Sequence, residues 1–136
     1  GVICARWNPT ITDALLASAL DTLASHAAEA QDVFVIRVPG AFELPAAARE
    51  AIDSEKPNAI VALAAIVRGE TSHHDVLAHA VAGALARLSA ETGTPIGFGV
   101  LTCDTMEQAR DRAAKGAEAA EAAIEMANLR RRPGRK

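Results

Sequence analysis

The stretch AIVALAAIV, residues 59–67, contains only apolar side chains. It is far shorter than the roughly 20 residues that span a bilayer, and its length favours a buried strand over a helix. A strand that is apolar on both faces is typical of a parallel sheet covered by helices on both sides. Three other strand-like, largely apolar runs occur at residues 2–5, 33–38 and 96–101.

The segments between and after these runs are predicted to be helices. Apolar side chains recur with a 3.6-residue period in the first of them, and Asp104 or Thr105 is suited to cap the fourth. The expected helices cover about residues 12–30, 42–53, 72–92, 106–113 and 117–129. With right-handed crossovers, the order βαβαβαβαα predicts an α/β fold, a three-layer, doubly wound (flavodoxin-like) four-stranded parallel sheet. We expect a single domain over residues 1–129 and a frayed basic tail over residues 130–136.

The composition excludes several classes of protein. Two cysteines without Cys/His ligand spacing argue against a disulfide scaffold or a metal site, so we expect a reduced, cytoplasmic setting. No apolar run is long enough for a transmembrane helix, and no leader peptide is recognisable, so no membrane contact is expected. The net charge is −3, and five of the 14 basic residues lie in the last seven positions. The acidic remainder argues against a nucleic-acid surface.

Aromatic residues make up only 3% of the chain. The core must therefore be built from Ala, Val, Ile and Leu, and the place of each aromatic side chain is informative. Trp7 follows the first strand and is free to stack on a flat ligand or to close the core. Phe98 lies within a strand, where core packing is the simpler interpretation. The other two are Phe34 and Phe42.

Ligands of doubly wound sheets bind beyond the carboxyl ends of the strands. The loop at residues 68–75, RGETSHHD, follows the most apolar strand and leads into a helix. Its backbone N–H groups, two hydroxyls and the helix dipole suit an anion such as phosphate, and His73 or His74 supplies a group that titrates near neutral pH. An N-cap with solvated histidines is the alternative interpretation of this loop.

Two other strand ends carry polar or aromatic groups. Asn8 suits a ligand hydroxyl or an Asx turn, and Glu43 suits a ligand or the first turn of a helix. Arg112 and Lys115 lie in or after the fourth predicted helix, where a solvated face is the default interpretation. Residue types and spacing alone therefore predict a parallel α/β domain with a phosphate-binding loop.

The sequence resembles the lumazine synthase family along nearly its whole length. The matching segments occur in the family's order and are Trp7-Asn8, VPGAFELP at 38–45, IVRGETSH at 66–73, FGVLT at 98–102, EQA at 107–109, KG at 115–116 and AIEMA at 123–127. The stretch between Arg112 and Lys115 is shorter than is usual in the family. His74 stands where an aromatic residue is common.

The resemblance implies an enzyme of riboflavin biosynthesis, a transferase without a cofactor. It would condense 5-amino-6-(D-ribitylamino)uracil with 3,4-dihydroxy-2-butanone 4-phosphate, releasing phosphate and water, to give 6,7-dimethyl-8-ribityllumazine. The residues implied for the pyrimidine and its ribityl chain are Trp7, Asn8, Ala41, Phe42, Glu43, Ile66, Val67 and Phe98. Those implied for the phosphate are Gly69, Glu70, Thr71, Ser72, Arg112 and, more weakly, Lys115. His73 would move protons, and Arg112 would pair with the phosphate.

The resemblance also implies a homopentamer with active sites between subunits. Phe98 and Arg112 would come from the neighbouring subunit, and some members assemble further into decamers or 60-subunit shells. Two other functions stay open. One is an archaeal-type riboflavin synthase, against which the phosphate loop and Arg112 argue. The other is a non-catalytic flavin or lumazine binder or a shell scaffold, against which His73 and Arg112 argue.

Overall fold

The computed structural model describes residues 1–26, 28–69 and 73–130. Its four strands are β1 (Val2–Ala5), β2 (Val35–Val38), β3 (Ile60–Val67) and β4 (Ile96–Cys103). Its helices are α1 (Pro9–Ser25), α2 (Leu44–Glu55), α3 (His73–Thr92), α4 (Met106–Asp111) and α5 (Lys115–Arg130), with 3₁₀ turns η1 (Ala30–Asp32) and η2 (Ala41–Glu43). The predicted order of elements is confirmed. Of the basic tail predicted at residues 130–136, Arg130 is the last residue of α5, and residues 131–136 lie outside the described residues.

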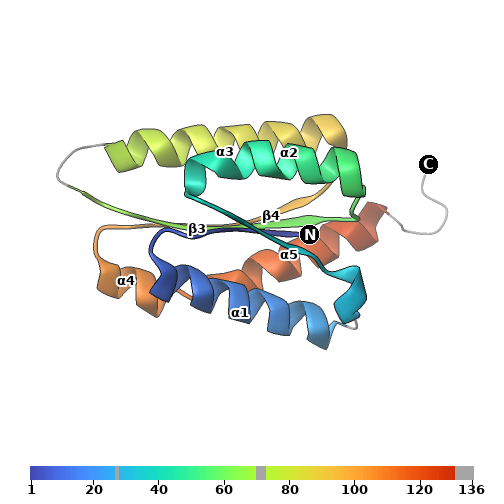
Figure 1. The fold of residues 1–136 in the computed structure, drawn as a ribbon, viewed down its shortest axis with the longest axis horizontal. Coiled ribbons are helices and arrows are strands. Elements are labelled where there is room, and N and C mark those ends of the chain that lie inside the picture. Colours follow the sequence, from blue (N-terminus) through green and yellow to red (C-terminus); the bar gives the residue numbers. More distant parts are fainter. Residues whose placement is uncertain (27, 70–72, 131–136) are drawn as a thin grey trace.

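The strands form one parallel sheet in the order β2-β1-β3-β4. Figure 1 shows α2 and α3 on one face of the sheet and α1, α4 and α5 on the other, so the predicted three-layer, doubly wound fold is confirmed. Strand β3 lies inside the sheet, between β1 and β4, and its first seven residues are buried. This burial explains why the sequence at residues 60–66 carries no polar side chain.

The core is aliphatic, as the composition predicts. Side chains of β1 alternate between its two layers, with Ile3 packing under α2 and α3 and Cys4 packing toward α1 and α5. Burial raises the pKa of the Cys4 thiol, so Cys4 behaves as a small apolar residue there. Glycine in β4 allows close approach, because a Cβ at Gly97 would collide with the backbone of Ala119 in α5.

Several predicted boundaries were wrong. Helix α1 begins at Pro9 rather than residue 12, because the proline sits in the first turn, where its missing N–H is no loss. It ends at Ser25 rather than residue 30. Just beyond this end, the N–H of Ala28 donates a hydrogen bond to the carbonyl of Leu23. Strand β2 begins two residues later than predicted, β4 extends two residues further, and α5 begins two residues earlier. These shifts change the ends of elements and leave the topology intact.

Within the described part of the chain, no helix is long and apolar enough to cross a bilayer. Phe34 is partly buried against the α2–α3 layer of the core. Trp7, Phe42 and Phe98 are 63%, 68% and 42% exposed, so three of the four aromatic residues lie at the surface. For Phe98 this overturns the interpretation as a core residue, because β4 lies at the edge of the sheet.

Candidate active site

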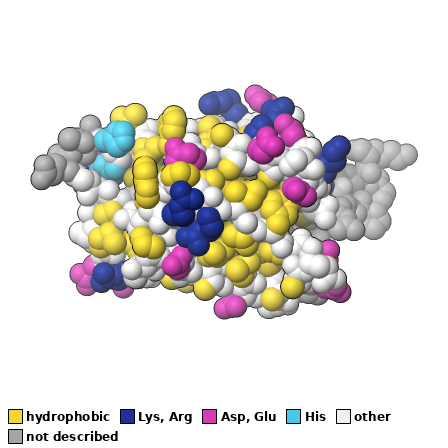
Figure 2. Space-filling view, in the orientation of Figure 1, with side chains coloured by type: hydrophobic (Ala, Val, Ile, Leu, Met, Phe, Trp, Pro, Cys, Tyr) yellow, Lys and Arg dark blue, Asp and Glu magenta, His cyan; other side chains and the backbone are white. Residues whose placement is uncertain are grey.

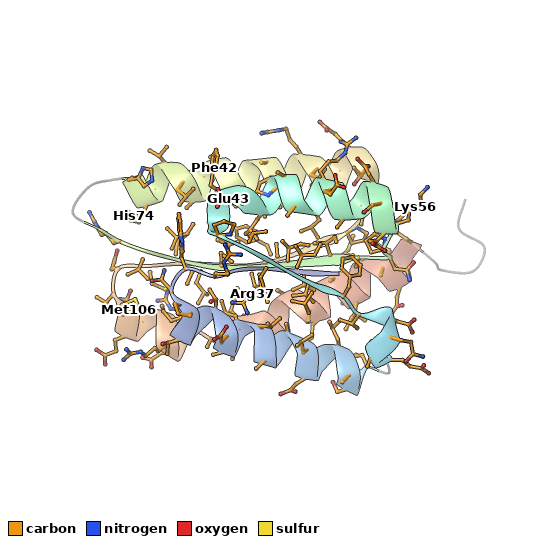
Figure 3. The ribbon with its side chains drawn as sticks, viewed as in Figure 1. Arg37, Phe42, Glu43, Lys56, His74 and Met106 are labelled. Atoms are coloured by element: carbon orange, nitrogen blue, oxygen red, sulfur yellow. The ribbon has the colours of Figure 1, made fainter. Side chains whose placement is uncertain are left out.

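A cavity of about 290 Å³ opens at the carboxyl ends of β1 and β3. This is the end of the sheet that the doubly wound topology selects for ligands. Figure 3 shows Phe42, Glu43 and His74 toward this end of the molecule and Lys56 at the opposite end. The residues that line the cavity are Ala5, Trp7, Asn8, Ala41, Ala65, Ile66, Val67, Gly69, His73, His74 and Leu77.

Trp7 forms one wall of the cavity because two backbone hydrogen bonds continue the β1–β2 ladder past the end of β1. The N–H of Arg6 donates to Val38 O at 2.7 Å, and the N–H of Trp7 donates to Pro39 O at 3.0 Å. The indole ring then lies over the backbone of Gly40, where a Cβ would come within 2.6 Å of Cζ3. The remaining ring surface is largely exposed, so it is available for stacking on a flat ligand.

Asn8 joins the end of β1 to the end of β3. Its backbone is left-handed, with φ 62° and ψ 56°, a conformation that asparagine tolerates better than most residues. Its Nδ2 donates to Ala65 O at 3.0 Å, and its carbonyl accepts the N–H groups of Ile11 and Thr12. The amide group is thus fixed in orientation at the cavity, with Oδ1 left as an acceptor for a ligand.

The segment after β2 presents Ala41 to the cavity, whereas Phe42 and Glu43 do not line it. Glu43 Oε1 accepts a hydrogen bond of 2.9 Å from the N–H of Gly40, which fixes the turn that supports Trp7. A carboxylate has further acceptor capacity beyond one such bond. The described geometry therefore gives Glu43 a role in holding this turn.

The end of β3 and the start of α3 form the opposite wall. Ile66 and Val67 contribute from the strand, and His73 contributes from the first turn of α3. Figure 2 shows histidine side chains at the end of the molecule where α3 begins. His74 is only 9% exposed, with Nε2 at 3.1 Å from Asp75 Oδ1. The predicted phosphate ligands Glu70, Thr71 and Ser72 lie outside the described residues.

Phe98, Arg112 and Lys115 are not in this cavity. They line a second, larger one of about 740 Å³ along the open edge of β4, and the two cavities share no lining residue. Arg112 caps α4, with Nη1 at 3.9 Å from Cys103 Sγ. Lys115 Nζ lies 3.4 Å from Glu118 Oε2. Apart from Phe42 and Glu43, which line neither cavity, the described site residues of one chain therefore fall into two separate groups.

The comparison with known families decides the identity of the fold. The family model described as 6,7-dimethyl-8-ribityllumazine synthase matches residues 1–131. The chain belongs to this family. Lumazine synthases are transferases of riboflavin biosynthesis that act on small molecules and are oligomeric.

Four cavity residues of this lumazine synthase family member were not predicted as site residues: Ala5, Ala65, His74 and Leu77. Ala65 contributes the carbonyl that orients Asn8, and Leu77 contributes an apolar wall one helical turn beyond His73. Leu77 was detectable in principle, since residues i and i+4 share a helix face. His74 was considered in the loop but not assigned. No cluster of three or more His, Cys, Asp or Glu suited to a metal ion occurs in residues 1–26, 28–69 and 73–130.

Proposed function

We propose that the protein condenses 5-amino-6-(D-ribitylamino)uracil with 3,4-dihydroxy-2-butanone 4-phosphate to form 6,7-dimethyl-8-ribityllumazine. The observation that carries this proposal is the cavity at the ends of β1 and β3. It combines an exposed indole, a fixed amide and a histidine beside the start of a helix. These groups suit a flat ring, a polyol chain and a proton transfer respectively.

The pyrimidine is proposed to stack on Trp7, against the carboxyl end of β3 at Ile66 and Val67. Asn8 Oδ1 is then free to accept a hydrogen bond from a ribityl hydroxyl. The backbone of Ala41 and Phe42 extends the same wall, and Glu43 would contribute its second carboxylate oxygen. The supporting contacts are the Asn8–Ala65 bond and the Glu43–Gly40 bond, which fix both groups before the ligand arrives.

The phosphate of the second substrate is proposed to bind at residues 69–72, beside the first turn of α3. Backbone N–H groups at the start of a 20-residue helix attract an anion. Arg112 would supply a paired guanidinium, and Lys115 a further positive charge. Neither side chain lies in the cavity of its own chain.

We infer that a second copy of the chain completes the site. The open edge of β4 presents Phe98 and Arg112 together on one cavity, away from Trp7 and His73. A ring of five copies, each placing its β4 edge beside the next cavity, would bring both groups of residues to every site. Decamers and 60-subunit shells would keep the same pairwise contact.

The chemistry requires no nucleophile from the protein. The 5-amino group attacks the ketone of the phosphorylated butanone, and loss of water gives an imine. Phosphate leaves by elimination, and ring closure releases a second water. Holding two reactants in register contributes ~7–11 kcal/mol in favourable cases, and a positioned histidine adds ~10²–10⁴-fold. His73 is proposed to carry the protons.

Incubation of the protein with both substrates tests this proposal. Formation of the fluorescent lumazine, with one phosphate released per turnover, is the expected result. A protein that binds both substrates without forming product would instead be a binding or scaffold member. Formation of riboflavin from two lumazines would identify it as a riboflavin synthase.

A further inference from the structure

Arg68 connects two parts of the chain that the proposed function uses in different ways. It is the first residue after β3 and directly precedes Gly69, where the proposed phosphate loop begins. Its N–H donates to Cys103 O at 2.9 Å, which continues the β3–β4 ladder beyond the pair Val67 and Cys103. Its Nη1 lies 3.6 Å from Asp104 Oδ1, in the segment that leads into α4.

From Asp104, short contacts continue to Arg112. The N–H of Asp104 donates to Gln108 Oε1 at 2.9 Å, and Thr105 caps α4 by accepting the N–H of Gln108 at 3.1 Å. The N–H of Arg112 in turn donates to Gln108 O at 3.2 Å. Helix α4 has only six residues, so the orientation of its start determines the place of Arg112 at its end.

The Arg68–Asp104 ion pair has little value as a stabilising contact. Its side chains are 58% and 65% exposed, and exposed pairs of this kind contribute little to the free energy of unfolding. Its location is more informative, because it joins the beginning of one strand-end loop to the beginning of the next.

We propose that Arg68 is a positioning residue for the phosphorylated substrate. Paired with Asp104, it aligns the start of the phosphate loop with the α4 segment that carries Arg112. This inference rests on the proposed function. It adds that, within one chain, the start of the phosphate loop is linked to the segment carrying Arg112, the arginine that this chain is proposed to supply to the site of the neighbouring subunit. Arg68 acts through Asp104 rather than by touching the phosphate.

Steady-state kinetics of Arg68→Ala and Asp104→Ala test the proposal. Each variant is expected to raise the KM for the phosphorylated butanone about threefold, the size of effect that loss of an exposed ion pair allows, and to leave the KM for the pyrimidine unchanged. The double variant is expected to be no worse than either single one, because both substitutions break the same contact. Arg68→Lys is expected to restore part of the loss.

Two results would overturn the proposal. If Arg68 bound phosphate directly, Asp104→Ala would leave the KM unchanged or lower it, because removing the carboxylate frees the arginine. Equal changes in both KM values would indicate a general structural defect instead. Arg49→Ala is the matched control, because it breaks an ion pair of similar exposure within α2, with Arg49 Nε 3.0 Å from Asp53 Oδ2. It is expected to change neither KM.

Binding of inorganic phosphate, measured by calorimetry, separates this inference from the proposed reaction. If the wild-type protein forms no lumazine yet binds phosphate, and Arg68→Ala and Asp104→Ala both weaken that binding about threefold, the reaction fails and the positioning role stands. If the wild-type protein binds no phosphate, or if both variants bind it as tightly as the wild type does, the positioning role is refuted.

Discussion

The indole ring of Trp7 lies over the backbone of Gly40, which brings the end of β1 against the turn after β2. The turn is held from its other side by the bond from the Gly40 N–H to Glu43 Oε1. The ring and the turn therefore hold each other in place, and the exposed face of the ring is already oriented at the cavity.

Substitution of Gly40 by alanine tests this arrangement. The added Cβ would displace the indole ring, since it would lie 2.6 Å from Cζ3. We expect the KM for the pyrimidine to rise about tenfold, in line with a typical overpacking cost of 1–3 kcal/mol. Trp7 is the sole tryptophan of the chain, so its fluorescence reports the displacement directly.

Gly83→Ala serves as the control for that experiment. A Cβ at Gly83 meets only the end of the Arg87 side chain at 3.5 Å, and position 83 lies within α3. The KM and the fluorescence should both stay at their wild-type values. An unchanged spectrum in the Gly40 variant would show that Trp7 does not rest on the turn.

Asn8 is expected to contribute to the free energy of unfolding through both its backbone conformation and its side chain. Asn8→Gly keeps the left-handed conformation and loses the bond to Ala65 O, which costs about 1 kcal/mol of unfolding free energy. Asn8→Ala loses the bond and also strains the backbone, by a further ~1–2 kcal/mol. Urea unfolding of both variants measures the difference. Equal stability would mean that the left-handed backbone carries no cost.

The sequence predicts the strands because the parallel topology imposes continuous apolar runs on them, as in residues 60–67. The same topology places Trp7 and Asn8 at strand ends, where ligands bind. Periodicity carries no information about strand order, so it did not predict that β4 lies at an edge and exposes Phe98. Contacts between residues far apart in the chain, such as Asn8 with Ala65, follow from three-dimensional packing and have no local signal.

The proposed roles of His73 and Arg112 predict unequal losses of activity. His73→Ala is expected to lower kcat by about 10²–10⁴-fold and leave measurable turnover, because positioning of the substrates continues without it. Arg112→Ala is expected to be more damaging through lost phosphate binding. The rate of lumazine formation at saturating pyrimidine measures both. Full activity of the Arg112 variant would refute its role.

Subunit complementation provides the most direct test of a site shared between copies of the chain. Trp7→Ala damages the cavity at β1 and β3, whereas Arg112→Ala damages the group at the β4 edge. If the two chains are unfolded, mixed in equal amounts and refolded into common rings, about a quarter of the sites receive both intact halves. The mixture is therefore expected to recover about a quarter of the wild-type activity, above that of either variant alone.

Mixing Trp7→Ala with Asn8→Ala provides the control, because both substitutions damage the same half and every site keeps a lesion. A mixture of the first pair that stays at the average of its components would place Arg112 and Trp7 in the same site of one chain, contrary to the separation of their cavities.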